Sequence, residues 1–361
     1  MKACLLNHDL SATTGAGRFG RALISALRNG DPRGTYDMFT HEDVLPRGWW
    51  GSLIALPRLR RLAGRYNVIH ALDGWPYGVL AAFMTAGTGR KLVITAIGTG
   101  AVQPLYNFIR RLFLHWAYQR ADALTAVSRH TRTEILKVVS GLVIEVINHG
   151  VNADSFKAPP SSLPEIEKLK PYILSVGALK SRKGFDTAIE ACARWRKRFP
   201  SLRYLIFGTG PEYERLRELA ETNGVGRQVI FVAYDTTLGS RVDEATLVAL
   251  YRNAELFLLL PRDVGKDIEG FGLVFLEAAA SGLPVVATRD SSAEDAVSDG
   301  ESGVLVPSAD PVAAAEAIAA ILSRPDLRRR FSRNAIAFAA ARNWRIVAER
   351  YRTVYHKVLA Q

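Results

Sequence analysis

The chain has 361 residues and a net charge of +12, and its 48% hydrophobic and 23% charged residues are ordinary for a globular protein. The length favours two domains, and the two cysteines, Cys4 and Cys192, exclude a disulfide framework and favour a reducing compartment. The sequence has no signal-peptide pattern and its longest apolar runs are too short to span a bilayer, so we expect a cytoplasmic protein.

The first strand, expected at residues 2–7, leads into "NHDLSATTGAGRFG", where Gly15, Gly17 and Gly20 form G-x-G-x-x-G. A dinucleotide-binding fold needs such glycines directly after the strand, and here a polar stretch separates the two. A milder interpretation is that Gly15 and Gly17 let the backbone approach a ligand, while a helix from about Arg18 directs its amides at an anion. An ordinary loop and helix cap is the alternative.

The rest of the first half alternates short apolar runs with helical patterns. Further strands are expected at 35–40, 67–71, 91–96, 122–127 and 143–147, and helices at 18–29, 105–120 and 129–139. This alternation is typical of a parallel sheet with helices on both faces.

The first half is also the basic half of the chain. Residues 1–160 hold 19 Lys and Arg against 10 Asp and Glu, a net of +9, whereas residues 161–361 hold 28 against 25. Two stretches, 56–66 and 106–121, mix basic residues with leucine and aromatic residues, which suits an anionic membrane surface. The basic residues concerned are Arg58, Arg60, Arg61, Arg65, Arg110 and Arg111. A core-facing amphipathic helix with a solvated basic flank is the alternative, and we expect no nucleic-acid partner because no binding module is recognised.

The segment "KAPPSSLPEIEKLKP" is rich in proline, serine and charge, and it is typical of an interdomain linker. A second alternating series follows, with strands expected at 172–176, 203–207, 228–232, 256–260, 284–287 and 304–306. Helices are expected at 184–199, 212–223, 245–253, 273–281, 311–323, 325–341 and 344–359. We therefore expect an α/β protein with two doubly wound Rossmann-like domains, 1–160 and 161–340, and a last helix, 341–361, packing back toward the first. The natural ligand site would be a central cleft between them, at the carboxyl ends of the strands.

The most informative segment is "DIEGFGLVFLEAAASGLPVVAT". Glu269 precedes a glycine turn, a helix begins near Leu273, and Glu277 lies one turn inside that helix. The first amides of a helix can bind a phosphate, and the two carboxylates can accept hydrogen bonds from hydroxyl groups. The alternative is a capped helix with Glu277 on a solvated face.

With these motifs the chain resembles the retaining glycosyltransferases of GT-B fold in glycosyltransferase family 4, whose hallmark E-x7-E appears here as "EGFGLVFLE". The segments "SVGALKSRKGFDTAIEA", "LIFGTGPEYERL", "INHGVNADSF" and "ESGVLVPSADPVAAAEAI" also resemble elements of that family. The resemblance covers both domains. It implies transfer of a sugar from a nucleotide diphosphate sugar, GDP-mannose or a UDP-sugar, to a glycan or lipid-linked acceptor. The domain 161–340 would bind the nucleotide sugar, and the domain 1–160 would bind the acceptor.

The resemblance also implies residue roles. Glu277 would bind the nucleotide ribose and Glu269 the donor sugar, while Arg182 and Lys183 would neutralise the diphosphate leaving group. Fixed cations suit that task because negative charge develops on the phosphate as its bond to the sugar breaks. The other positions implied at the donor are Gly15, Gly17, Gly177, Gly208, Gly270, Phe271, Gly272, Leu273 and Val274. No D-x-D motif or histidine–cysteine cluster is visible, so we expect no obligate metal and no cofactor besides the sugar nucleotide.

Two positions depart from the family pattern. Many members have G-R-L where this chain has Gly177-Ala178-Leu179, and many place a histidine after the fourth strand, where this chain has Ile97. Ile97 keeps open a second function, a catalytically inactive module that binds a glycan or a partner protein. His149 stands where asparagine is common and is expected to be structural, and a dehydrogenase is a third, weaker alternative.

Overall fold

The computed structural model describes residues 1–11, 14–44, 48–156, 164–234 and 244–361, which form two compact units. Unit 1 comprises Met1–Gly150, Lys266–Phe271 and Trp344–Gln361, and unit 2 comprises Val151–Gly265 and Gly272–Asn343. The expected domain boundary at residue 160 and much of the expected linker lie outside the described residues.

Unit 1 contains a six-stranded parallel sheet in the order β2-β1-β3-β4-β5-β6. Its strands are β1 (Lys2–Leu6), β2 (Thr35–Phe39), β3 (Val68–Leu72), β4 (Lys91–Ala96), β5 (Ala123–Ala126) and β6 (Ile144–Val146). Each was predicted to within a residue or two, because short Val, Ile and Leu runs are the signature of a strand buried on both faces.

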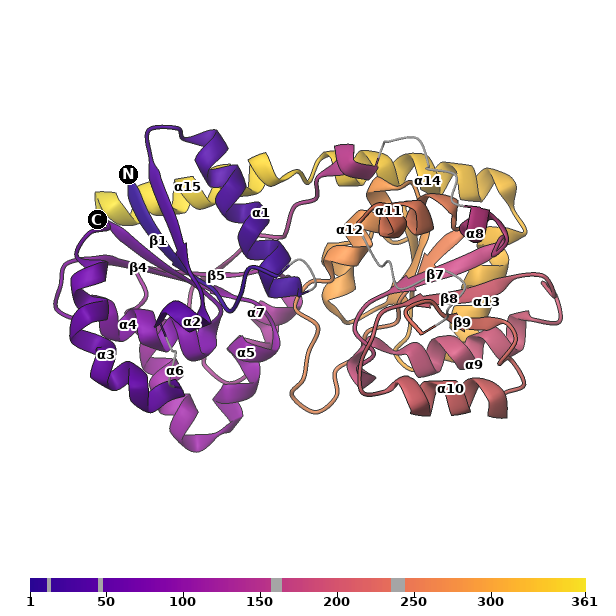
Figure 1. Ribbon diagram of the computed structural model, residues 1–361, viewed down its shortest axis with the longest axis horizontal. Coiled ribbons are helices and arrows are strands. Elements are labelled where there is room, and N and C mark those ends of the chain that lie inside the picture. The colour runs from indigo at the N-terminus through magenta and orange to yellow at the C-terminus, as the bar shows by residue number, and fades with distance from the viewer. Residues whose placement is uncertain (12–13, 45–47, 157–163, 235–243) are drawn as a thin grey trace. The chain divides into compact units, whose positions relative to one another are not determined.

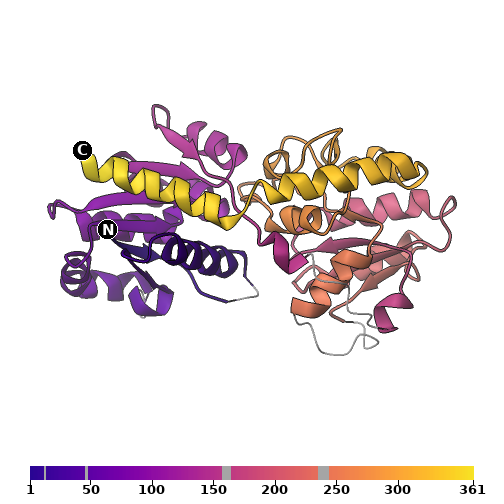
Figure 2. The ribbon, with the colours of Figure 1, turned by 90° about the horizontal axis from the view of Figure 1, so that it is seen from above.

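Side chains of β1 alternate between two cores. Ala3 and Leu5 pack with α1 (Gly15–Gly30) and α15 (Trp344–Ala360), whereas Cys4 and Leu6 pack into the core on the opposite face. The two-residue period of a strand produces this division. In Figure 2, α15 in yellow and α1 in indigo lie on the same face of the sheet.

The opposite face of this sheet carries the remaining helices of unit 1, with α3 beside α4 and α4 beside α6 (Figure 1). They are α2 (His41–Val44), α3 (Gly48–Ala63), α4 (Val79–Thr85), α5 (Thr99–Val102), α6 (Phe108–Arg120) and α7 (Arg129–Leu136), with short turns η1 (Gly74–Gly78) and η2 (Gln103–Tyr106). No helix in the described part of the chain is both long and apolar enough to cross a bilayer.

Unit 2 contains a second six-stranded parallel sheet, in the order β12-β11-β10-β7-β8-β9. Its strands are β7 (Tyr172–Val176), β8 (Arg203–Phe207), β9 (Val229–Phe231), β10 (Leu256–Leu258), β11 (Val285–Thr288) and β12 (Gly303–Val306). Two doubly wound parallel domains are thus confirmed.

Helices cover both faces of the second sheet, with α13 beside α9 on one face and α12 beside α14 on the other (Figure 1). They are α8 (Pro164–Glu167), α9 (Phe185–Trp195), α10 (Tyr213–Thr222), α11 (Glu244–Asn253), α12 (Leu273–Ala280), α13 (Pro311–Leu322) and α14 (Pro325–Ala340), with turns η3 (Ala153–Phe156), η4 (Ser181–Lys183) and η6 (Ser292–Asp295). Where strand order reverses, between β7 and β10, the carboxyl ends of two strands open a place for a ligand.

Candidate functional site

Glycines line the carboxyl ends of β7 and β8 in unit 2. A Cβ on Gly208 would overlap the carbonyl oxygen of Gly177, so only glycine lets the two loops approach this closely. Lys183 is buried and lies over Gly177, because its Nζ would be 3.8 Å from a Cβ placed there. The two glycines therefore position a buried ammonium group at the carboxyl edge of the sheet.

A left-handed residue sets the loop that carries Arg182 and Lys183. Gly184 has φ +68°, and a Cβ there would overlap the carbonyl oxygen of Leu260. Any other residue would strain both the backbone and the contact with the segment after β10. The backbone N–H of Arg262 also donates to the carbonyl of Arg182 at 2.9 Å, which ties the loop to the same segment.

Arg262 is a residue that the sequence analysis missed. Its guanidinium donates to both carboxylate oxygens of Asp186, at 2.6 and 2.9 Å, and Arg215 lies 3.4 Å from the same carboxylate. Burial raises the pKa of Asp186, but the hydrogen bonds and charges of these arginines outweigh it and hold that pKa below its usual range. The signal was present in "LLLPRD", a cation just past the end of a buried strand.

Glu277 is buried in α12. It accepts a hydrogen bond of 3.0 Å from the hydroxyl of Tyr251 on α11, so the alternative of a solvated surface glutamate is wrong. The helix begins after Gly272, whose φ of +81° is left-handed and whose Cβ would lie 2.7 Å from the ring of Phe275. The predicted helix start near Leu273 is thus confirmed, and the burial of Glu277 is a finding of the structure.

Glu269 belongs to unit 1, not to unit 2. The next residue, Gly270, is fixed there through its carbonyl, which accepts from Ser128 Oγ at 2.6 Å and from Thr131 Oγ1 at 3.3 Å. A Cβ on Gly98 would lie only 2.7 Å from the Cα of Gly270, so two glycines pass each other closely. The two glutamates of E-x7-E are therefore held by contacts within different units.

His149 packs beside this segment. Its ring lies 4.9 Å from that of Phe271 and 4.4 Å from that of Phe19, and burial lowers its pKa to about 3 although Glu269 raises it. The neutral, enclosed imidazole agrees with the structural role expected of it. Ile97 packs against the core of the α1 and α15 face, as an apolar residue should.

The glycines near the N-terminus differ from expectation. Helix α1 begins at Gly15, three residues earlier than predicted, because the Thr14 side chain accepts from the backbone N–H of Gly17 at 2.9 Å and caps the helix. A Cβ on Gly17 would overlap Asp9 and Ser11, so this glycine accommodates a crossing loop. A Cβ on Gly15 meets no described atom within 4 Å, which leaves Gly15 as the glycine with open space beside it.

A polar cluster at the carboxyl edge of the first sheet was also missed. His8 Nδ1 and His41 Nδ1 each lie 3.0 Å from the hydroxyl of Tyr77. One hydroxyl has one proton, so one imidazole accepts it while the other donates its own N–H. His8 and Tyr77 follow β1 and β3, which are the neighbouring strands where the order of this sheet reverses.

Asp73, directly after β3, completes this edge. Its φ of +138° is rare for a residue with a side chain, and its carboxylate accepts from the backbone N–H of Gly74 at 2.7 Å. Burial raises its pKa to about 7, although hydrogen bonds from the backbone of Gly74 and Ile97 oppose the rise. Strained residues of this kind cluster at functional sites.

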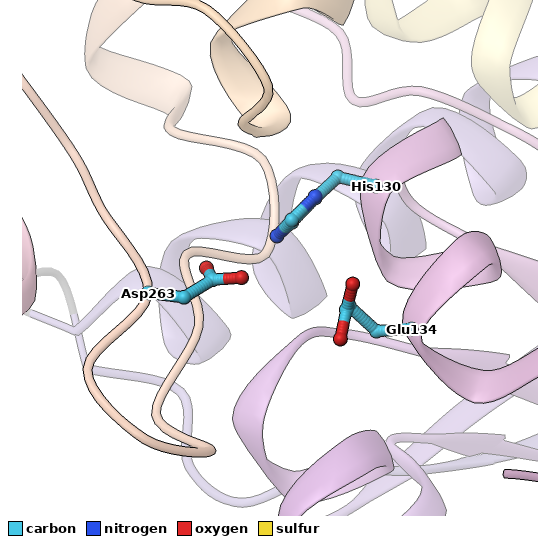
Figure 3. A group of neighbouring side chains, drawn as sticks. All are labelled: His130, Glu134 and Asp263. Atoms are coloured by element: carbon cyan, nitrogen blue, oxygen red, sulfur yellow. The ribbon is translucent and has the colours of Figure 1, made fainter. Parts of the chain in front are cut away.

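A third group contains two side chains one turn apart on α7. Figure 3 shows His130 and Glu134 extending from that helix, and the third side chain labelled there, Asp263, belongs to the other unit. Lys137 donates to the Glu134 carboxylate and neutralises it, and we assign no metal to this group.

Two family models match this chain, one in each half of the sequence. Residues 163–338 match the family model described as "Glycosyl transferases group 1", and residues 20–144 match "Glycosyl transferase 4-like domain". The first match contains all strands of the second sheet, and the second contains β2 to β5 of the first sheet.

Curated relatives are similar over most of their length. One is a GDP-mannose-dependent alpha-(1-6)-phosphatidylinositol monomannoside mannosyltransferase of Mycobacterium tuberculosis, 30% identical over 316 residues, covering 83% of this chain and 77% of the relative. Another is a D-inositol 3-phosphate glycosyltransferase of Corynebacterium urealyticum, 37% identical over 354 residues, covering 90% and 79%.

Solved structures share the fold. The Anabaena protein HepE, in complex with UDP and glucose, has a TM-score of 0.78 at 19% identity, covering 99% of this chain and 100% of that one. Sucrose-phosphate synthase from Thermosynechococcus elongatus has a TM-score of 0.80 at 22% identity, covering 100% and 99%. The fold is GT-B, and the chain belongs to the glycosyl transferases group 1 family, glycosyltransferase family 4.

Proposed function

We propose that the protein is a retaining glycosyltransferase that moves a sugar from GDP-mannose or a UDP-sugar to a glycan or lipid-linked acceptor, in cell-surface polysaccharide or glycolipid synthesis. The observation that carries this proposal is the set of groups in unit 2 that follow β7 and β10, namely a buried lysine, a helix that begins after a left-handed glycine, and a buried glutamate in that helix. The names of the relatives, one GDP-mannose-dependent and one solved with UDP, support a nucleotide-sugar donor.

Each group in this set has a matching part of the nucleotide. Glu277, already bonded to Tyr251, accepts from a ribose hydroxyl, and Lys183 with Arg182 neutralises the diphosphate. The first amides of α12, contributed by Leu273 and Val274, add further donors to phosphate oxygens. Cations and amides together would stabilise the leaving group without an obligate metal.

The transfer exchanges one bond for another. The bond from the anomeric carbon to the diphosphate oxygen breaks, the bond to the acceptor oxygen forms, and the acceptor proton passes to the departing diphosphate. Glu269 holds the hydroxyls of the donor sugar, and attack from the side of the departing phosphate retains the anomeric configuration. NMR of the new linkage tests this, since an inverted anomer contradicts the retaining assignment.

The nucleotide itself can be identified by thermal shift. A ligand that binds only the folded state raises the melting temperature, by an amount that grows with its concentration relative to Kd. We expect one of UDP and GDP to stabilise the protein and ADP to have a smaller effect. Absence of a shift with all three would contradict the site.

Ile97 favours a second function, a glycan-binding or protein-binding module without transferase activity, because it is apolar and packs against the core. Slow hydrolysis of the donor by the purified protein separates the two functions. A module that binds nucleotide sugar without releasing its sugar would support the second.

The acceptor is proposed to meet the enzyme at an anionic membrane surface, on the inner face of the cell membrane. The net charge of +9 over residues 1–160 supports this, since each basic residue near such a surface contributes about 1 kcal/mol.

A further inference from the structure

Helix α6 of unit 1 exposes large apolar side chains. Phe108 is 79% exposed, Ile109 63% and Leu112 58%, and the nearby Tyr106 is 44% exposed. Isolated exposed apolar residues are ordinary, but several on one helix mark an interaction surface. The alternative of a core-facing amphipathic helix with a solvated basic flank holds for the buried side of α6, but it does not account for these exposed apolar residues.

The helix has two apolar stripes. Leu114, Ala117 and Tyr118 are buried against the sheet, and the opposite stripe begins at Phe108 and Ile109. We call this opposite stripe the α6 apolar face, and its members are Phe108, Ile109, Leu112, Phe113 and Trp116. At 3.6 residues per turn, these positions fall along one side of the helix.

The base of this face is anchored while its outer end is not covered by described residues. The rings of Phe113 and Trp116 lie 6.2 and 4.8 Å from that of Phe83 on α4, which holds them against unit 1. Phe108 and Leu112 are the more exposed residues of the same face. The face thus packs on α4 at one end and exposes apolar groups at the other.

The charge around this face has one sign. Arg110 and Arg111 are both exposed near the start of α6. Arg111 lies beside Phe108 on the helix. Arg110 lies one turn before the buried Leu114, with its guanidinium 5.5 Å from the Trp75 ring.

The sequence from 74 to 121 contains no aspartate or glutamate. Helix α3 lies on the same face of the sheet, and α4 lies between it and α6 (Figure 1). Arg58 and Arg61 of α3 are exposed. An occupant of this surface must tolerate apolar insertion and supply negative charge.

We propose that the α6 apolar face inserts into the headgroup and acyl boundary of an anionic lipid membrane, with the neighbouring Arg111 at the lipid phosphates. Charge complementarity favours lipid over a second copy of this chain, because a two-fold contact would place the same basic surface against itself. This proposal adds the attachment site to the membrane surface named in the proposed function. It rests on the proposed function only where it takes the membrane to be the source of the acceptor, because insertion itself needs no catalysis.

Insertion differs from purely electrostatic attraction in its response to salt. Surface charges are screened as ionic strength rises, whereas burial of apolar groups is not. We therefore expect binding to vesicles of phosphatidylcholine and phosphatidylglycerol to weaken at high salt without disappearing.

The test is co-sedimentation of the full chain with these vesicles and with phosphatidylcholine alone. The variant Phe108→Ser, Ile109→Ser, Leu112→Ser should lose at least about tenfold in partitioning, and Arg111→Glu a smaller factor that vanishes at high salt. Val143→Ser is the matched control, because Val143 is 91% exposed elsewhere in unit 1, and it should bind as the native chain does. Equal binding by the triple variant and the native chain would overturn the proposal.

A second measurement reports insertion directly. Both native cysteines are buried, so Leu112→Cys can be labelled selectively with a polarity-sensitive dye. Anionic vesicles should shift its emission to the blue and leave labelled Val143→Cys unchanged. Equal shifts at both positions, or a native dimer that the triple variant abolishes, would refute insertion.

As a control, each membrane-binding variant should show the same nucleotide-induced rise in melting temperature as the native chain. Loss of vesicle binding with an intact nucleotide shift supports the face, whereas an absent nucleotide shift in the native chain counts against the proposed function and not against insertion.

Discussion

The two sheets have the same kind of reversal in strand order, but the side chains at their carboxyl edges differ in chemistry. In unit 2 the strand order reverses between β7 and β10, and the loops after these strands carry Lys183 and Arg262. In unit 1 it reverses between β1 and β3, and the loops there carry His8 and Tyr77. Parallel sheets place ligands at such reversals, so the side chains decide which ligand. The buried ammonium group of Lys183 suits a diphosphate, whereas imidazole and phenol groups suit the hydroxyls of an acceptor.

The largest effect should come from the cation of unit 2. Lys183→Ala removes the buried ammonium over Gly177, which we propose stabilises the departing diphosphate, so we expect turnover to fall by roughly 100- to 1,000-fold. Initial rates with saturating donor measure this. Lys197→Ala, an exposed lysine just past α9, is the control and should keep native turnover; equal losses in both variants would remove Lys183 from the site.

Loss of the buried carboxylate should be next in size. Glu277→Ala removes the proposed ribose acceptor and leaves the Tyr251 hydroxyl without this partner, so nucleotide affinity should fall by roughly 10- to 100-fold. Calorimetric titration with the stabilising nucleotide measures the affinity. A folded variant with native affinity would show that Glu277 only supports the helix.

A substitution at the carboxyl edge of the unit 1 sheet should weaken acceptor binding and leave nucleotide binding unchanged. Tyr77→Phe removes the hydroxyl shared by His8 and His41, so we expect the KM for the acceptor to rise by about tenfold while nucleotide affinity stays unchanged. The KM for the acceptor and the Kd for the nucleotide, both measured for this variant, show which of the two ligands each edge binds. Weaker nucleotide binding with an unchanged acceptor KM would reverse the assignment of the two edges.

The last effect concerns stability and not activity. Burial lowers the pKa of His70 and of His149 to about 3 in the folded protein, against an ordinary value of 6.5. The unfolded chain therefore binds protons that the folded one does not, and stability is lost as pH falls from 6.5 toward 3, by up to about 1.4 kcal/mol per pH unit for each histidine. Asp73, whose pKa is raised, acts in the opposite direction over part of this range.

Urea unfolding at a series of pH values measures this slope. His70 is bonded to Tyr355 and Thr95 in the core, so His70→Gln should also lower stability at neutral pH. The expected signature is a shallower decline below pH 6.5 than in the native chain. An unchanged decline would assign the acid sensitivity to other groups.

The strand and helix pattern was determined by sequence, because buried parallel strands are short runs of branched apolar residues. Tyr172–Val176 and Arg203–Phe207 lie where those runs predicted them. Gly272 and Glu277 were also readable, since a glycine turn before an apolar helix is a local signal. The start of α1 was missed by three residues because it depends on one side-chain cap at Thr14.

Only the tertiary structure decided which distant residues meet. Tyr77 is 69 residues from His8 and 36 from His41, and the order β2-β1-β3 brings all three to one edge. The segment Lys266–Phe271 joins unit 1 through Ser128 and Thr131, although its neighbours in sequence belong to unit 2.

Helix α6 shows the same limit on a smaller scale. Its sequence contains two apolar stripes, and periodicity alone does not say which one packs on the sheet. Packing buries Leu114 and Tyr118 and exposes Phe108 and Leu112. The sequence determined local structure because its causes lie within a few residues, whereas sites and surfaces depend on strand order and packing, which join residues far apart in the chain.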